Sequence, residues 1–133
     1  MKQFNFVFLG NYKNHGQNVE QSIRHTLTGR VEKADNVKHS VSADCLGYQI
    51  KSAKASVCKG TDIEKYLDDD KATAYIYGTR NGIAYEMSRA EYTEFLLEFG
   101  YITRESEKNG GGEKIRLKDE SKKMLRWLEV RVF

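Results

Sequence analysis

The chain has 133 residues and a formal net charge of +3; 39% of its residues are hydrophobic, 31% are charged and two are cysteines. This length and composition predict a single globular domain, 1–133, and exclude a disordered chain. No apolar run approaches the roughly 18 residues of a transmembrane helix, and neither a secretory cleavage site nor a zinc-binding cysteine pattern is evident, so we expect a cytoplasmic protein.

The first predicted elements are a strand and a helix. Residues 4–9 (FNFVFL) form an apolar run that leads into a polar stretch, which is typical of a strand followed by a loop. Downstream, apolar residues recur at every fourth position and would line one face of a helix: Val19, Ile23 and Leu27. This spacing predicts a helix over about 16–28 that ends at Gly29.

Two segments rich in β-branched or small residues follow, 38–44 and 48–57. Neither has a helical period, and residues 46–47 between them are short enough for a two-residue turn, so the segments predict a β-hairpin. Thr61 and Glu64 then fit a capping box, in which a hydroxyl and a carboxylate each accept a hydrogen bond from a backbone amide at the start of a helix. We therefore expect a short helix to begin at Thr61.

A second hairpin and a longer helix are predicted in the middle of the chain. Residues 73–79 and 83–87 flank Asn81-Gly82, a pair well suited to the positive φ angles of a two-residue type I′ turn. A second capping box, formed by Ser88 and Glu91, predicts a helix over 88–99 that stops at Gly100. The apolar face of this helix comprises Tyr92, Phe95, Leu96 and Phe99.

The C-terminal part predicts a third hairpin and a last helix. Residues 101–106 and 113–117 flank a glycine-rich tip, and Asp119 is placed to cap a final helix. Together the predicted elements indicate an α+β (mixed α/β) fold, in which a central sheet built from hairpins is flanked by helices.

Positive and negative charges are unevenly distributed along the chain. Residues 1–60 contain nine Lys or Arg and four Asp or Glu, a net charge of +5; residues 61–100 contain four and nine, or −5; residues 101–133 contain nine and six, or +3. If the two basic ends meet in the fold, they form a positive surface suited to a polyanion. Alternatively, these are solvated surface charges that cancel.

The first predicted hairpin carries three polar residues that can act together, Asp44, Gln49 and Lys51. With residues 46–47 in the turn, Asp44 lies directly opposite Gln49, and directly opposed residues share a face of a sheet. Lys51 lies on the same face because it is two residues from Gln49 on one strand. A carboxylate, an amide oxygen and an ammonium group on one rigid face suit a Mg²⁺ (or Mn²⁺) site that binds a phosphate group.

This arrangement resembles the PD-(D/E)XK nuclease superfamily, whose core hairpin carries an acidic residue on one strand and an acid-x-Lys, sometimes Gln-x-Lys, on the next. The resemblance covers roughly residues 15–60 and implies a restriction-endonuclease-like core and a Mg²⁺-dependent endonuclease that hydrolyses DNA phosphodiester bonds. It implies catalytic roles for Asp44, Gln49 and Lys51, and metal ligation by Asp44, Gln49 and Glu20, the last from the preceding helix. Two features depart from the family pattern: no proline precedes Asp44, and an amide replaces the second carboxylate.

The same residues also fit an ordinary surface. Asp44 can be a turn residue, and Gln49 and Lys51 can form the solvated face of an edge strand. Glu20 can pair with Arg24, four residues later on the predicted helix.

Binding without catalysis is the second function that the sequence supports. The helix over 88–99 and the hairpin that follows are similar to a winged helix, so the protein would be a DNA-binding module or a small inhibitor or adaptor of a nucleic-acid-handling protein. The residues expected to contact phosphates are Lys54, Arg104, Lys108, Lys114 and Arg116. A nuclease of this size that cuts both strands of a duplex is also expected to act as a homodimer.

Overall fold

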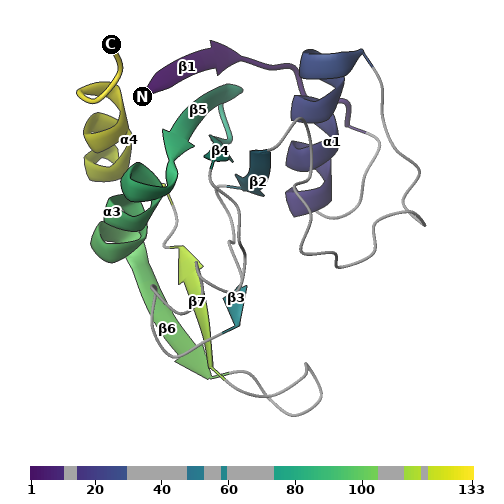
Figure 1. Cartoon of the computed structure of the whole chain (residues 1–133). Coiled ribbons are helices and arrows are strands. Elements are labelled where there is room, and N and C mark those ends of the chain that lie inside the picture. The colour runs from purple at the N-terminus through teal and green to yellow at the C-terminus, as the bar shows by residue number, and fades with distance from the viewer. Residues whose placement is uncertain (11–14, 30–47, 53–57, 60–73, 105–112, 118–119) are drawn as a thin grey trace.

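The computed structural model describes residues 1–10, 15–29, 48–52, 58–59, 74–104, 113–117 and 120–133. In chain order they form β1 (Lys2–Asn5), α1 (His15–Thr28), β2 (Tyr48–Ser52), β3 (Cys58–Lys59), β4 (Ala74–Gly78), β5 (Ile83–Ser88), α3 (Arg89–Phe99), β6 (Gly100–Arg104), β7 (Glu113–Leu117) and α4 (Lys122–Glu129). The fold is mixed α+β, as the sequence predicts (Figure 1). The expected strand at 38–44, the turn at 46–47 and the helix at Thr61 lie outside the described residues. Among the described helices, none is long and apolar enough to cross a membrane.

The described strands form a four-stranded and a three-stranded sheet. In the larger sheet, with the order β1-β5-β4-β2, β1 is antiparallel to β5 and β2 is parallel to β4. The β4–β5 hairpin at its centre is flanked by strands from elsewhere in the chain, so among the described strands this sheet is not built from hairpins alone. The smaller sheet is antiparallel, has the order β3-β7-β6 and extends below α3 in Figure 1.

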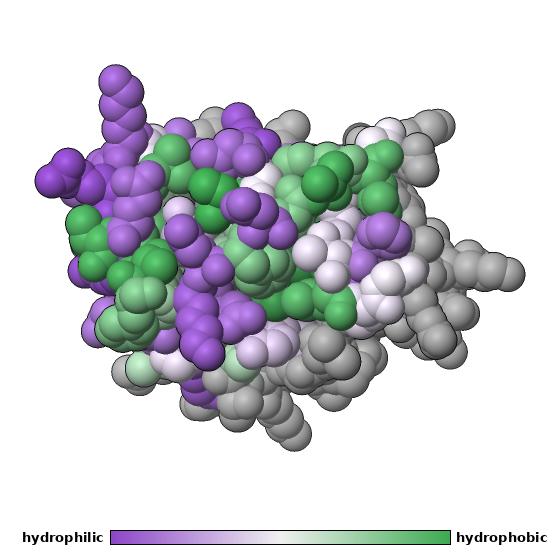
Figure 2. Space-filling model, turned by 90° about the horizontal axis from the view of Figure 1, so that it is seen from above, coloured by the Kyte–Doolittle hydropathy of each residue, from purple (hydrophilic) through white to green (hydrophobic). Residues whose placement is uncertain are grey.

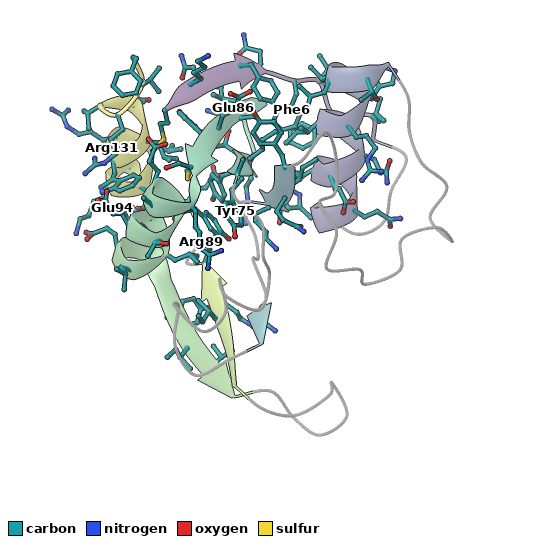
Figure 3. All side chains as sticks on the ribbon, viewed as in Figure 1. Phe6, Tyr75, Glu86, Arg89, Glu94 and Arg131 are labelled. Atoms are coloured by element: carbon teal, nitrogen blue, oxygen red, sulfur yellow. The ribbon has the colours of Figure 1, made fainter. Side chains whose placement is uncertain are left out.

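One face of the larger sheet, which we call the α3 side, is covered by α3, α4 and β7. Tyr75 and Tyr77 of β4 are fully buried there in a cluster with residues of these three elements. The ring of Tyr75 stacks on that of Tyr92 in α3 with 4.1 Å between centroids, and Figure 3 shows Tyr75 in the interior beside α3. The ring centroids of Phe95 in α3 and Trp127 in α4 are 5.6 Å apart. These aromatic contacts hold both helices on this face.

The opposite face, which we call the α1 side, is covered by α1. Val19 and Ile23 of the helix are fully buried against Ile50 of β2 and Ile76 of β4. The approach is close at Gly78, where an added Cβ atom would lie 2.6 Å from Cγ1 of Val19 and 2.8 Å from Cδ1 of Ile23. Glycine is therefore the residue that lets this helix reach the sheet.

The structure confirms the predicted first helix, the strands of the second and third hairpins, and the helix capped by Ser88. The Ser88 hydroxyl accepts a hydrogen bond from the Glu91 amide at 3.2 Å, and the Glu91 carboxylate accepts one from the Ser88 amide at 2.9 Å. This is the predicted capping box, and α3 begins directly after it.

The loop of the β4–β5 hairpin is longer than predicted. The amide of Thr79 donates to the carbonyl of Ile83 at 2.9 Å, so three residues, 80–82, form the loop. The amide of Gly82 donates back to the carbonyl of Thr79, and Gly82 has a φ of +82°. A turn followed by a left-handed glycine is a three-residue loop with a bulge, so the predicted two-residue turn at Asn81-Gly82 is wrong.

The first strand also has different bounds from those predicted. It covers Lys2–Asn5 rather than 4–9. Asn5 faces Ile83, the first residue of β5, so the ladder has no β5 partner beyond this position. Phe6 is instead buried in the cluster on the α1 side. The length of the partner strand, rather than the extent of the apolar run, decides where β1 ends.

The last helix is capped by Ser121 rather than by Asp119. The Ser121 hydroxyl accepts a hydrogen bond from the Met124 amide at 3.1 Å. Glu120 accepts a hydrogen bond from the Arg80 amide at 2.9 Å and thereby joins this segment to the β4–β5 loop. Because residue 120 is held there, the helix starts later than predicted.

Replacing Gly78 with alanine is expected to lower the free energy of unfolding by about 1–3 kcal/mol, because the new methyl group overlaps with side chains of α1. The Val19→Ala variant removes the nearest of these atoms. The double variant Gly78→Ala/Val19→Ala should therefore lose less stability than the sum of the two single losses. Urea unfolding of the parent and these variants measures the coupling, and strictly additive losses would contradict the packing of α1 on β4 at Gly78.

Candidate metal and nucleic-acid site

β2 carries two of the three predicted catalytic residues, Gln49 and Lys51. The strand lies at the end of the described larger sheet, where Gln49 is in register with Tyr75 and Lys51 with Tyr77. Because paired residues of neighbouring strands share a face, Gln49 and Lys51 both lie on the α3 side. The Gln-x-Lys pair is thus brought together on one face of a strand.

Gln49 is only 6% exposed, whereas Lys51 is half-buried. A buried amide loses its hydration and lies in a medium where charges interact more strongly than in water. This burial disagrees with the alternative in which Gln49 belongs to a solvated strand face.

Glu20, the third predicted metal ligand, lies elsewhere. Its Oε1 atom is 3.2 Å from Nη2 of Arg24, whose side chain is 6% exposed. The ion pair within α1 that the sequence offers as an alternative to metal ligation is therefore present. α1 covers the α1 side, whereas the register of β2 with β4 places Gln49 and Lys51 on the α3 side.

Three predicted site residues, Asp44, Lys54 and Lys108, lie outside the described residues. Within the part of the chain that the structure describes, no group of three His, Cys, Asp or Glu side chains is arranged to hold a metal ion. Asp44 precedes Gln49 by five residues, so their Cα atoms are at most about 18 Å apart. The carboxylate of the predicted metal site is thus expected from this undescribed segment.

The smaller sheet separates the predicted phosphate-contacting residues onto two faces. Arg104 is in register with Glu113, which shares a face of β7 with the buried Ile115 and Leu117. Lys114 and Arg116 occupy the alternate positions of β7 and therefore lie on the other face. Lys59 of β3, which the sequence analysis did not single out, is in register with Lys114. A strand of two residues, such as β3, is too short to show an alternation of polar and apolar residues in the sequence. Only the clustering of basic residues could have drawn attention to Lys59.

A groove of about 360 Å³ lies between the start of β1, the end of β5 and the beginning of α3, and Tyr48, which directly precedes Gln49 on β2, also lines it. Two carboxylates line it, Glu86 and Glu91. Figure 3 shows Glu86 beside β1, where it is in register with Lys2. The Glu91 carboxylate lies 3.2 Å from the Met1 ammonium group. Each carboxylate faces a basic group at the start of the chain, which indicates that the two carboxylates hold β1 in place.

The surroundings of Glu91 lower the pKa of its carboxyl group, whereas the surroundings of Tyr85 raise the pKa of its phenol. Partial burial alone would raise the pKa of Glu91, but hydrogen bonds from the Ser88 backbone, the Met1 ammonium and the Ser88 hydroxyl together lower it. Burial raises the pKa of Tyr85, and the negative charges of Glu129 and Glu120 raise it further. The carboxylate is thereby kept charged and the phenol neutral.

Figure 2 shows the molecule from above, where hydrophobic side chains reach the surface in separate patches between hydrophilic ones.

No family model matches the chain, and no curated protein and no solved structure is similar to it. Its function must therefore be argued from the placement of its own residues.

The Glu91→Gln variant tests the link between this carboxylate and stability. At neutral pH we expect a loss on the order of 1 kcal/mol or less, because solvent screens a partly exposed charge. A lowered pKa means that the carboxylate stabilises the fold above its ordinary pKa and loses this contribution as the pH falls through the lowered pKa of the folded state. The difference between parent and variant should therefore be full at neutral pH and vanish only below that lowered pKa. Urea unfolding at a series of pH values measures it, and a difference that is constant with pH would contradict the assignment.

Proposed function

We propose that this protein is a Mg²⁺-dependent nuclease with a restriction-endonuclease-like core that hydrolyses phosphodiester bonds of DNA. The observation that carries the proposal is the placement of Gln49 and Lys51 on one shielded face of β2. The order of elements also supports it, since the Gln-x-Lys strand follows a helix, α1, that packs on the same sheet.

The chemistry of the donor set fits a magnesium ion. Magnesium prefers oxygen ligands, often one or two carboxylates together with waters and a substrate phosphate. Asp44 would supply the carboxylate and Gln49 the amide oxygen, and the ion would lower the pKa of a bound water and polarise the phosphate. The ammonium group of Lys51, on the same face, would stabilise the negative charge that develops on the scissile phosphate.

The proposal does not depend on Glu20. Its pairing with Arg24 and its location on the helix that covers the opposite face favour a structural role within α1. A site with one carboxylate and one amide binds metal more weakly than the usual pair of carboxylates, so millimolar rather than micromolar magnesium is the appropriate assay condition.

DNA binding without catalysis is the second candidate, because a helix is followed directly by an antiparallel hairpin, α3 and β6–β7. As a recognition helix, however, α3 has the wrong charge. Its buried face packs in the core, while Glu94 and Glu98 are exposed, and Figure 3 shows Glu94 on the outer side of the helix. Phosphates would repel these carboxylates. This charge favours the nuclease or a protein partner over a winged helix.

The direct test is cleavage of a supercoiled plasmid and of short duplexes in magnesium or manganese. We expect cleavage by the parent and a loss of at least about 100-fold in rate for both Asp44→Ala and Lys51→Ala, the size typical of a charge-stabilising group. Lys122→Ala, which removes an exposed lysine from α4, is the matched control and should retain full activity. Cleavage that survives both site substitutions would remove the assignment.

Gln49→Glu tests the metal site without relying on turnover. A second carboxylate near Asp44 should lower the thermal midpoint without metal because like charges repel, and should raise it with metal because the ion binds both. We expect a larger manganese-induced rise of the midpoint than in the parent. Glu20→Gln is the control, and its manganese response should equal that of the parent. Identical responses of Gln49→Glu and the parent would contradict a metal site at Gln49.

A further inference from the structure

The outer edge of β1 is open to solvent. β1 is a terminal strand of the larger sheet, whose described order is β1-β5-β4-β2, and Figure 1 shows it along the upper margin of the molecule. Lys2, Gln3 and Asn5 are exposed, and Phe4 is half-buried. A terminal strand whose outer side is exposed can pair with a further strand.

The backbone hydrogen bonds of β1 alternate between its two sides. The amide of Phe6, directly after the strand, donates to the carbonyl of Gly82, directly before β5, at 2.8 Å. In an antiparallel pair every second residue bonds to the partner strand, so the even-numbered residues of β1 direct their backbone groups to β5. The N–H and C=O groups of Gln3 and Asn5 therefore point away from β5. Within the described part of the chain, they have no hydrogen-bond partner.

Residues 131–133 show that this outer side accepts a partner. The Met1 ammonium donates to the carbonyl of Arg131 at 2.8 Å, and the carbonyl of Met1 accepts a hydrogen bond from the amide of Phe133 at 3.2 Å. Met1 is odd-numbered, so both bonds agree with the alternation along the strand. Among the described residues this segment bonds to the edge at Met1 and leaves the edge open at Gln3 and Asn5.

We propose that this edge is an interface between two copies of the chain, in which β1 pairs antiparallel with β1 of the second copy about a twofold axis. A pair centred on Asn5 places this residue opposite its own copy, and Gln3 opposite Val7 of the second copy. The outward groups of each strand then bond to those of the other. This centre leaves the bonds between Met1 and residues 131–133 intact. The two larger sheets become one continuous sheet across the axis.

The charges of the edge suit a second copy. Lys2 is the charged residue of β1, and its register partner on β5 is Glu86, so opposite charges face each other within one chain. In the pair centred on Asn5, the two copies of Lys2 are roughly 20 Å apart along the strands. The residues that do face each other, Gln3, Asn5 and Val7, are uncharged. Pairing of two copies therefore opposes no like charges.

Two exposed apolar side chains flank this edge. Val7 is 79% exposed, and Phe133 is fully exposed. Because the amide of Phe133 bonds to Met1, this residue lies on the outer side of the chain, just before Gln3. In the pair centred on Asn5, Val7 of one copy lies opposite Gln3 of the other, and the chain beyond it approaches Phe133 of that copy. A second copy thus covers apolar surface on both sides of the axis, which a polar peptide would not do.

Sedimentation velocity without DNA or metal tests the interface at protein concentrations from about 1 to 200 µM, because a small interface gives a weak dimer. The parent should change from monomer to dimer over this range. Gln3→Pro removes the outward N–H group but not the bonds to β5, and should raise the midpoint concentration of dimerisation at least about tenfold. Gln3→Ala keeps the N–H group and is the matched control, so it should dimerise like the parent.

A second variant tests the position of the twofold axis. Asn5→Lys places two ammonium groups opposite each other across the axis, so it should weaken the dimer, and more strongly at low salt than at high salt. Ala90→Lys adds the same charge at an exposed position of α3 and should leave dimerisation unchanged. Circular dichroism and the thermal midpoint confirm that each variant is folded.

Two outcomes would overturn the proposal. A parent that stays monomeric at about 200 µM would leave the edge to a strand of another protein. A dimer that neither Gln3→Pro nor Asn5→Lys weakens would place the interface elsewhere.

The inference rests on the backbone of β1 and not on the proposed function, and the two fail separately. Dimerisation through β1 without any cleavage of DNA retains the interface and rejects the nuclease. Cleavage that depends on Asp44 and Lys51, by a protein that stays monomeric, retains the nuclease and rejects the interface. Where both hold, the dimer carries two Gln-x-Lys strands, which suits an enzyme that cuts both strands of a duplex.

Discussion

Burial of the β4–β5 hairpin on both of its faces is the constraint on which the rest of the fold depends. Tyr75, Ile76 and Tyr77 are consecutive, and each is fully buried. Because neighbouring residues of a strand point to opposite faces, three such residues require cover on both sides of the sheet. On one side the rings of Tyr75 and Tyr77 contact aromatic rings of α3, and the Tyr77 hydroxyl donates a hydrogen bond to Sδ of Met124 in α4. On the other side the small Gly78 admits α1. A two-sided sheet at the centre thus explains why helices lie on both faces.

The same alternation decides which polar residues can act together. In-register pairing with β4 places Gln49 and Lys51 on the α3 side, whereas Glu20 belongs to the helix on the α1 side. The family resemblance implied one site for these three residues, whereas the helix that carries Glu20 covers the other face of the sheet. The smaller sheet sorts charges by the same rule, because Arg104 and Lys114 differ by one step in register and therefore lie on opposite faces.

Local signals in the sequence predicted much of the fold, and long-range pairing accounts for the remainder. The Ser88–Glu91 capping box and the apolar spacing of α1 depend only on residues a few positions apart, and both are present in the structure. The parallel pairing of β2 with β4 and the short β3 depend on partners far along the chain, which no local pattern encodes. For the site, the sequence identified the Gln-x-Lys strand, but the side of the sheet that carries Glu20 follows from the packing of α1, and the face of Arg104 follows from strand register.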